Sequence, residues 1–449
     1  MTTSTTRRNF MKQMAAAGAV ASTASLAIPR RVYAQNQKLR VAFIGVGGIG
    51  GQHRNAIHSL GEDCPCFADV DRRTWGEILK QWPNARGYQD YREMFDKEAK
   101  NFDAVMIGTP DHHHYPATVL AFQAGKHVYT QKPLTQTVWE ARQLTKLAAA
   151  NPKIVTQMGN QGHAGEGWRL VYEWIHSGAL GDVLEVHSWT NRPVWPQGIK
   201  RPEGEDPVPS ELDWDVWIGP SPMRPYKNRT YHGFNWRGWW DFGAGALGDM
   251  ACHTMDGMFW ALDPGHAATV EPVAATPHND DSFPSSTVVK WTFPAKGNRK
   301  AFTAYWYDGG LKPPRPADLE PNRRLAETGN LFIGTKASII VSGDYGDSPR
   351  IYPESKMREI GRPPRLLERH QGGNFVANHI KEWVNACKGQ GKTLSDFAYA
   401  GPMSETILLG NVAIRVGTKL EWDGENMRVT NYDAANEFIT KPYRDGWKF

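Results

Sequence analysis

Short, continuously apolar runs alternate with amphipathic stretches over the first third of the chain. Such runs are typical of strands buried on both faces of a parallel sheet, and the stretches between them have helical spacing. Strands are expected at residues 40–44, 64–69, 103–108, 127–130 and 153–157. Helices are expected at residues 52–60, 75–81, 91–100, 115–124 and 138–150. This alternation predicts an α/β domain with a doubly wound parallel sheet over residues 38–158.

The pattern changes after about residue 159. Residues 187–240 are rich in Pro, Gly and Trp and have few periodic stretches. Later segments resemble antiparallel strands, at residues 286–293, 301–306, 330–333 and 337–342. Helical spacing returns at residues 374–387 and 402–417. We therefore expect a second, α+β domain over residues 159–449, built on an open and largely antiparallel sheet.

Residues 1–34 have the pattern of a leader rather than of a folded segment. Arg7 and Arg8 precede a weakly apolar, Ala-rich run, and Ala34 closes a small-residue cleavage site. The run is too short and too poor in large apolar residues for a membrane span, which needs about 20 of them. The leader predicts export by the twin-arginine machinery to the periplasm or another extracytoplasmic site, without stable membrane insertion.

The leader also explains the basic charge of the chain. It carries five of the 52 basic residues and none of the 47 acidic ones, so the remaining chain has a formal charge of zero. A nucleic-acid partner is therefore not expected. The four cysteines do not form a disulfide framework, although the expected compartment is oxidising.

A glycine-rich turn follows the first expected strand. Gly45, Gly47 and Gly50 occupy the three glycine positions of G-x-G-x-x-G, which suit a tight turn, close approach to a pyrophosphate, and close helix–strand packing. Asp69 ends the next strand, 19 residues after Gly50, at the distance expected for binding an adenosine ribose. The context predicts a Rossmann dinucleotide site. Arg72 and Arg73 could reach the 2′-phosphate of NADP, but Asp69 would repel it, so NAD is favoured.

Three residues are candidates for proton chemistry. Lys132 follows the strand at residues 127–130, at the edge where open parallel sheets bind ligands. Asp249 and His253 are four residues apart and share one helical face, so His253 could take a hydroxyl proton while Asp249 orients it. The alternatives are a surface lysine at a turn and an ordinary pair on a helix surface.

Two further groups of side chains allow more than one interpretation. Seven tryptophans between residues 189 and 240 could form a platform for sugar rings, or could bury one another. The run from Asp111 to His114 resembles a metal-binding tract, but no partner cluster has ligand spacing. We expect no metal, and we expect this loop to line the nicotinamide half of the site.

Together these stretches resemble the Gfo/Idh/MocA oxidoreductases. The resemblance rests on the glycine turn, Thr109-Pro110-Asp-His, Lys132-Pro133, and Gly248-Asp249-x-x-x-His253. It implies that Lys132, Asp249 and His253 are catalytic. It also implies a second domain that closes the site and often mediates homo-oligomers. The cofactor-binding residues would be the glycines, Asp69, Thr109, His114, Gln131 and Lys132. Gln131 departs from the family, which usually has Glu before Lys-Pro.

The resemblance implies an NAD(P)-dependent enzyme that transfers hydride to or from a secondary hydroxyl of a sugar, cyclitol or glycoside. Because no free nicotinamide pool exists outside the cytoplasm, we expect NAD to stay tightly bound. One alternative is a redox-neutral glycosidase that works by oxidation and elimination. A second is a non-enzymatic sugar-binding protein with a relict nucleotide domain, against which the intact Lys132, Asp249 and His253 argue.

Overall fold

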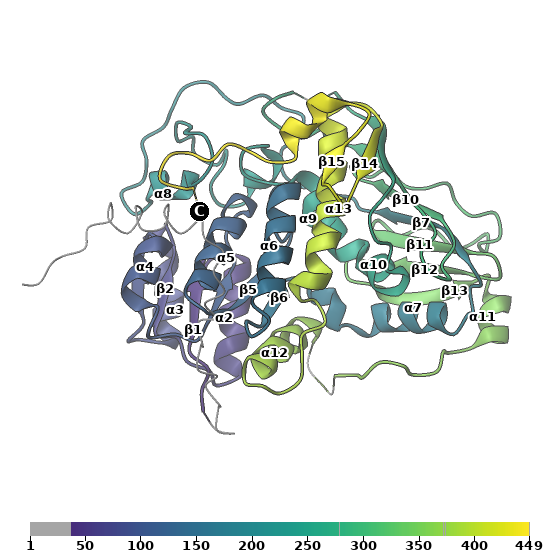
Figure 1. The fold of residues 1–449 in the computed structure, drawn as a ribbon, viewed down its shortest axis with the longest axis horizontal. Coiled ribbons are helices and arrows are strands. Elements are labelled where there is room, and N and C mark those ends of the chain that lie inside the picture. Colours follow the sequence, from purple (N-terminus) through teal and green to yellow (C-terminus); the bar gives the residue numbers. More distant parts are fainter. Residues whose placement is uncertain (1–36, 278, 371, 373, 449) are drawn as a thin grey trace, which may run out of the picture. The chain divides into compact units, whose positions relative to one another are not determined.

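The computed structural model describes residues 37–277, 279–370, 372 and 374–448 of the chain. The expected leader, residues 1–34, lies outside these described residues. The described residues form two sheets, one parallel and one mixed, with helices packed against them (Figure 1).

The first sheet is parallel throughout and has the order β3-β2-β1-β4-β5-β6. Its strands are β1 (Val41–Ile44), β2 (Cys66–Ala68), β3 (Arg86–Tyr88), β4 (Ala104–Ile107), β5 (His127–Thr130) and β6 (Thr156–Met158). The helices of this part are α2 (Ile49–Ser59), α3 (Trp75–Gln81), α4 (Tyr91–Glu98), α5 (His114–Gln123) and α6 (Val138–Ala150), with 3₁₀ helices η2 (Arg72–Thr74) and η3 (Asp111–His113). The predicted doubly wound fold is confirmed.

Alternate residues of β1 show how the first sheet is covered. Val41 and Phe43 pack with side chains of α2, α3 and α12 (Phe375–Cys387), whereas Ala42 and Ile44 pack with side chains of α4, α5 and α6. All four residues are fully or almost fully buried. A strand covered on both faces must be apolar at every position, which is why its sequence shows no alternation.

The second sheet has the order β13-β12-β11-β7-β10-β9-β8-β14-β15 and is antiparallel except for the β7–β10 pair. Its strands are β7 (Val183–Trp189), β8 (Thr269–Ala275), β9 (Thr287–Phe293), β10 (Phe302–Tyr307), β11 (Gly329–Gly334), β12 (Ser338–Ser342), β13 (Asp347–Tyr352), β14 (Leu420–Asp423) and β15 (Arg428–Val429). The predicted open, largely antiparallel sheet is confirmed.

Helices α7, α9, α10 and α13 pack against one face of the second sheet (Figure 1). The helices after β6 are α7 (Glu166–His176), α8 (Trp214–Ile218), α9 (Gly245–Thr254), α10 (Asp256–Leu262), α11 (Glu354–Ile360), α12 and α13 (Phe397–Val416), with 3₁₀ helices η4 (Gln161–Ala164), η5 (Asn235–Gly238) and η6 (Asp433–Phe438). Helix α13 begins five residues before the predicted start at Pro402, because the Asp396 side chain caps it by accepting the N–H of Tyr399.

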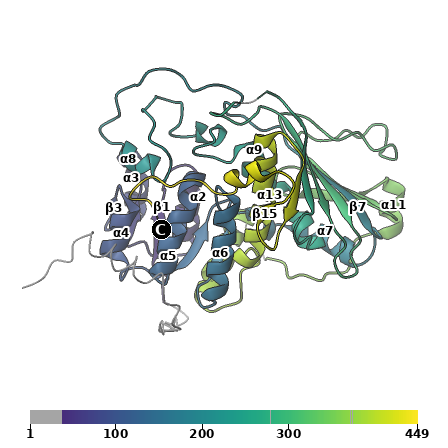
Figure 2. The same ribbon diagram turned by 45° about the horizontal axis from the view of Figure 1, so that its top comes forward.

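The last described segment, residues 440–448, returns to the first sheet and is here called the C-terminal clasp (Figure 2). Its Trp447 is buried against the rings of Tyr91 and His113, with centroids 5.8 and 5.4 Å away. The guanidinium of Arg92 lies 3.8 Å from the centroid of the Trp447 ring. The clasp therefore joins the end of the described chain to α4 and η3.

No helix among the described residues combines the length and the apolar character that crossing a membrane would require.

Candidate active site

A cavity of about 740 Å³ opens at the carboxyl ends of the parallel strands. One wall consists of the glycine turn after β1 and of residues that follow β2, β4 and β5. The opposite wall consists of α9, residues near the end of β7, and parts of residues 189–240, here called the tryptophan-rich segment. Ligands of open α/β sheets bind at this edge, so this cavity is the candidate site.

The glycine turn has the shape that its sequence predicted. Gly45 has a φ of +80°, and a Cβ there would lie 2.9 Å from the carbonyl oxygen of Gly108. A Cβ on Gly50 would lie 2.1 Å from the carbonyl oxygen of Gly45, so a glycine is needed for helix α2 to begin so close to β1. Helix α2 has no side-chain cap and no acidic residue in its first turn. The N–H groups of Gly50 and Gly51 bind the carbonyl oxygens of Gly47 and Gly48, at 2.8 and 3.1 Å, but the partial positive charge of this helix end still favours an anion such as a pyrophosphate.

Replacing Gly50 tests this packing. We expect Gly50→Ala to lower the free energy of unfolding by about 1–3 kcal/mol, as overpacking does, and to displace the turn from its nucleotide. Gly51→Ala is the matched control, because its Cβ would meet no atom closer than 3.8 Å. Thermal unfolding and nucleotide content should change in the first variant and not in the second. Equal behaviour of the two variants would contradict the role given to Gly50.

Two carboxylates lie at the end of the cavity beside β2. Asp69 accepts the backbone N–H of Val46 at 2.9 Å and that of Asp71 at 3.0 Å, so it braces the glycine turn. Each carboxylate oxygen keeps a lone pair that could accept a ribose hydroxyl. Asp71, which the sequence analysis did not select, also lines the cavity and binds His232 of the tryptophan-rich segment at 2.9 Å.

The two arginines that could have bound an additional phosphate are already engaged. Arg73 forms an ion pair with Asp71 at 2.6 Å. Arg72 donates to the carbonyl oxygen of Ser210 at 3.0 Å. Neither arginine lines the cavity. These contacts favour NAD over NADP.

The histidines at residues 112–114 connect the loop after β4 to the tryptophan-rich segment and to the loop after β5. His112 and His113 both approach the carbonyl oxygen of Trp217, at 2.9 and 2.8 Å. His114, predicted to contact the cofactor, does not line the cavity, because its two ring nitrogens face the carbonyl oxygens of Pro133 and Thr109 at 2.7 and 2.9 Å. Its role is therefore to hold two cavity-lining loops together.

Among the described residues, no cluster of three His, Cys, Asp or Glu side chains could hold a metal ion.

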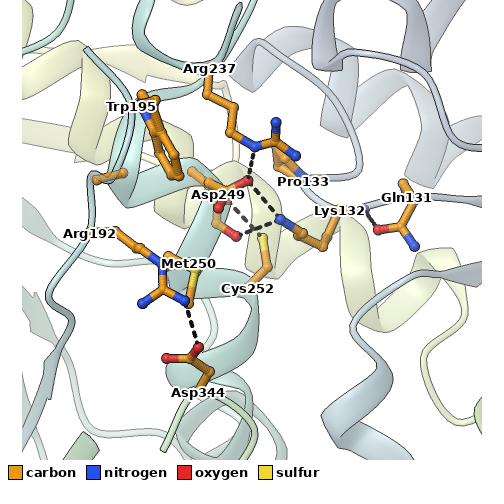
Figure 3. Close-up of polar contacts among 12 residues, drawn as sticks. Gln131, Lys132, Pro133, Arg192, Trp195, Arg237, Asp249, Met250, Cys252 and Asp344 are labelled. Carbon is orange, nitrogen blue, oxygen red and sulfur yellow. Dashed lines mark hydrogen bonds and ion pairs between the residues drawn. The ribbon is translucent and has the colours of Figure 1, made fainter. Parts of the chain in front are cut away.

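Lys132 and Asp249 meet in the cavity (Figure 3). The Nζ of Lys132 donates to Oδ1 of Asp249 at 2.8 Å and to its carbonyl oxygen at 3.0 Å. The Nε of Arg237 donates to the same Oδ1 at 3.1 Å. Burial raises the pKa of Asp249, but the two cations outweigh burial and hold that pKa below its usual value. Asp249 is thus an ionised carboxylate shared by two cations.

His253 lines the same cavity, one helical turn after Asp249. It is buried, and its Nδ1 has no hydrogen-bond partner among the described residues. Burial and the Lys132 ammonium lower the pKa of His253 to about 3, against the opposing effect of Asp249. The imidazole is therefore uncharged at neutral pH.

The structure differs from the predicted Asp249–His253 couple in one respect. The two side chains share the cavity, but Asp249 binds Lys132 and Arg237 instead of hydrogen-bonding to the imidazole. The cause is electrostatic, since a buried carboxylate is stabilised more by cations than by an uncharged ring. Asp249 therefore positions Lys132 rather than His253.

Gln131, where the family usually has Glu, lies on the cavity beside a buried histidine. Its Nε2 lies 2.8 Å from Nε2 of His53, and its Oε1 accepts the backbone N–H of Lys132 at 3.2 Å. Burial lowers the pKa of His53 to about 3, so the imidazole is uncharged and accepts the amide proton. An uncharged Gln–His pair thus holds the backbone of Lys132, where a glutamate would require His53 to carry a proton on Nε2 and donate it.

Several buried polar atoms along the cavity have no hydrogen-bond partner among the described residues. They are Thr109 Oγ1, Asp111 Oδ1, Gln161 Nε2, His232 Nδ1 and His253 Nδ1. A buried polar group without a partner costs about 1–3 kcal/mol. Their clustering along one cavity suits a polar ligand that supplies the missing partners. This set and the glycine turn fit a nicotinamide dinucleotide with a polar second ligand.

Most rings of the tryptophan-rich segment bury one another. Trp214 and Trp239 pack with neighbouring aromatic rings and do not line the cavity. Trp195, Trp217 and Trp236 do line it, and Arg237 lies 5.7 and 4.3 Å from the ring centroids of Trp195 and Trp236. The sugar platform is thus reduced to these three rings at most, whereas self-packing accounts for the rest.

Sequence reasoning missed Arg192 and Asp344, which face the cavity as an ion pair of 3.0 Å (Figure 3). Arg192 lies three residues after β7, and Asp344 two residues after β12. No local motif marks either residue. Only the pairing of the second sheet brings them together.

Two family models match successive parts of the chain. Residues 39–158 match an oxidoreductase family with an NAD-binding Rossmann fold, and residues 174–298 match the C-terminal alpha/beta domain of that family. Together the two matches cover more than half of the chain.

Curated relatives match over shorter stretches. The chain is 31% identical over 167 residues to an inositol 2-dehydrogenase of Rhodococcus erythropolis, covering 36% of this chain and 47% of that protein. It is 27% identical over 205 residues to a glycosyl hydrolase family 109 protein of Shewanella pealeana, covering 40% and 44%. The chain thus spans a little under half the length of these relatives.

Solved structures match over much more of the chain. The WlbA dehydrogenase from Bordetella pertussis, in complex with NADH and UDP-GlcNAcA, superposes with a TM-score of 0.60 and 18% identity. The match covers 86% of this chain and 99% of that one. At this identity the likeness establishes the fold.

Proposed function

Because this chain belongs to the Gfo/Idh/MocA family of NAD-binding oxidoreductases, we propose that it transfers a hydride between bound NAD and a secondary hydroxyl group of a sugar, cyclitol or glycoside. One observation carries the proposal: Lys132, ionised Asp249 and uncharged His253 line one cavity that begins at the glycine turn. The inositol 2-dehydrogenase relative supports a polyhydroxylated ring as the substrate.

Each residue has a distinct role in this reaction. His253 takes the proton of the hydroxyl group, since its imidazole is uncharged and its Nδ1 is free of described partners. Lys132 places a positive charge where negative charge develops on the oxygen. Asp249 and Arg237 fix the position of Lys132. NAD, when bound, supplies the hydride acceptor.

The same cavity provides contacts for the whole dinucleotide. The turn of Gly45, Gly47 and Gly50 would receive the pyrophosphate, and Asp69 and Asp71 the adenosine ribose. Thr109, Gln131 and Lys132 would line the nicotinamide end. We propose that NAD stays bound after purification.

Identifying the nucleotide is the first test. The protein is purified without added cofactor and denatured, and the released nucleotide is identified by mass. Close to one NAD per chain is expected. The protein is then mixed with a panel of sugars and cyclitols, and reduction of the bound nucleotide is followed by its absorbance. No nucleotide and no reduction with any member of the panel would contradict the proposal.

The C-terminal clasp should slow release of the nucleotide. Trp447 packs on His113, a cavity-lining residue, and Arg444 forms an ion pair with Asp215 at 2.6 Å. We expect Trp447→Ala to accelerate nucleotide loss on dialysis by roughly 10-fold or more, because truncating a buried tryptophan removes several kcal/mol of packing. Trp422→Ala on β14 is the control for loss of a buried tryptophan outside the cavity. Equal nucleotide loss in both variants would contradict a clasp.

A redox-neutral glycosidase is the second candidate, favoured by the glycosyl hydrolase family 109 relative. Oxidation at C3 of a glycoside moves a hydride to the nucleotide and acidifies the C2–H bond. Loss of that proton expels the aglycone, water adds to the resulting double bond, and the hydride returns to C3. An aryl glycoside incubated without added NAD separates the candidates by product mass: a keto sugar indicates the dehydrogenase, a free sugar and free phenol the glycosidase.

We also propose export through the twin-arginine pathway, which the Arg7-Arg8 leader and the expected cofactor loading before export support. Replacing both arginines by lysine should retain the protein in the cytoplasm. Immunoblots of separated periplasmic and cytoplasmic fractions test this. An unchanged distribution would contradict the proposal.

Self-association is proposed from the family resemblance and from the second sheet. The stacked rings of His187 and Tyr305, 4.8 Å apart, lie on the face of β7 and β10 opposite the one that packs on the helices. Light scattering of the purified protein should give a multiple of the chain mass. A monomer at all concentrations would contradict it.

A further inference from the structure

Asp111 is a buried carboxyl group on the cavity that the proposed reaction does not use. It is the first residue of η3, it is 1% exposed, and it lines the cavity. The backbone N–H of Ala244 binds the carboxyl group. Its Oδ1 has no hydrogen-bond partner among the described residues. A buried polar atom without a partner, on a residue that lines a cavity, indicates a ligand contact.

Asp111 and Asp249 are two carboxyl groups in one cavity with opposite ionisation. Lys132 and Arg237 donate hydrogen bonds to Asp249, whereas no described cation donates to Asp111. Burial, followed by repulsion from Asp249, raises the pKa of Asp111 well above its usual value, against the weaker effects of Lys132 and Arg237. The remaining titratable groups that act on Asp111 are Cys252 on α9 and Lys441 in the C-terminal clasp.

The protonation state decides what Asp111 can bind. A protonated carboxyl group donates one hydrogen bond, whereas an ionised carboxylate only accepts. With Ala244 satisfying one acceptor position, the O–H group is left without an acceptor in the protein. The missing partner is therefore an oxygen with a free lone pair. Carbonyl oxygens meet this requirement, so the partner of the O–H group need not be an anionic carboxylate.

We propose that Asp111 is a further ligand-binding residue of this cavity, an uncharged acid whose O–H group donates a hydrogen bond to a carbonyl oxygen of the bound ligands. The inference rests on the proposed function. Two carbonyls have the required chemistry: the carboxamide of the nicotinamide and the keto group of an oxidised sugar. Separating the two is part of the test.

Two substitutions distinguish the O–H donor from a structural role. Asp111→Asn keeps the shape and a hydrogen-bond donor but does not titrate, and Asp111→Ala removes the donor. The native rate should fall in the alkaline range, where Asp111 loses its proton, and the rate of Asp111→Asn should fall less, because an amide does not titrate. Asp111→Ala should lose roughly 10-fold or more of kcat/KM at neutral pH, because a buried acceptor is left unpaired.

The control is Asp308→Asn, which removes a buried carboxyl group outside the cavity. Burial raises the pKa of Asp308 to about 7, and its carboxyl group binds Thr287 and Trp306 of the second sheet. This variant should keep the alkaline fall of the native rate. Thermal unfolding of all three variants identifies any that do not fold, and Asp111→Asn keeps the proposal testable if Asp111→Ala does not.

Nucleotide content and substrate affinity identify the carbonyl. A lower NAD content in Asp111→Ala assigns the bond to the carboxamide, whereas full NAD content with a raised KM or a lowered kcat assigns it to the sugar. The inference is overturned if Asp111→Asn keeps the native alkaline fall, or if Asp111→Ala has native kcat/KM and NAD content. A native protein without NAD or hydride transfer instead overturns the proposed function itself, and this inference with it.

Discussion

Lys132→Ala should lower the rate of hydride transfer by about 10³-fold or more, since the variant lacks the ammonium at the point where oxygen becomes negative. Arg237 still pairs with Asp249 in this variant, so the carboxylate is not left without a cation and the fold should survive. Single-turnover reduction of the bound nucleotide by a reactive sugar measures the effect directly.

Two variants control for charge and for folding. Lys80→Ala removes a lysine whose side chain is 73% exposed on the surface and should leave the rate unchanged. Lys132→Arg keeps the charge but not the compact ammonium, and should recover only part of the rate. If Lys132→Ala turned over normally across a sugar panel, the assigned chemistry would have to be abandoned, and a sugar-binding protein with a relict nucleotide domain would be favoured.

His253→Gln should lower the rate by about 10²–10⁴-fold, the usual contribution of a positioned general base. The structure also predicts the form of the pH profile. Because the pKa of His253 is lowered to about 3, the imidazole is already the uncharged base at every pH well above that value. The native rate should therefore not fall when the pH is lowered through about 6.5, the ordinary histidine pKa.

Nucleotide content and thermal unfolding should be the same for the native protein and His253→Gln. The lower rate of the variant then reflects the chemical step rather than cofactor loss or unfolding. The measurement is kcat against pH for both proteins. An acid-side fall near pH 6.5 in the native protein that disappears in His253→Gln would show that His253 is not desolvated as described.

The fold was predictable where local pattern is decisive. Continuous apolar runs identified β1 and β4 because both faces of a doubly wound sheet are covered. β7 was not predicted, although it lies in the middle of the second sheet. Its exposed Leu184 and Glu185 interrupt any regular alternation, and its pairing with β10 and β11 joins segments more than 100 residues apart.

The candidate site was predictable where a motif fixes backbone geometry, as at the glycine turn and at Lys132. It was not predictable where side chains from separate elements compete for one partner. The contact of Arg237 with Asp249 depends on how η5 lies against α9, and the contact of His114 with Pro133 depends on how two loops meet. Electrostatics and burial in the folded protein decide these contacts, and the spacing of residues along the sequence gives no information about either.

The position of Trp447 has a consequence for the order of assembly. The ribosome adds Trp447 only after it has synthesised the strands of both sheets. The rings of Tyr91 and His113, against which Trp447 packs, therefore lack this contact until synthesis is almost complete. If the C-terminal clasp slows nucleotide release, as proposed above, it should also slow nucleotide entry once Trp447 has packed. Denatured protein returned to native conditions should accordingly regain full NAD occupancy faster when NAD is present from the start than when NAD is added after refolding.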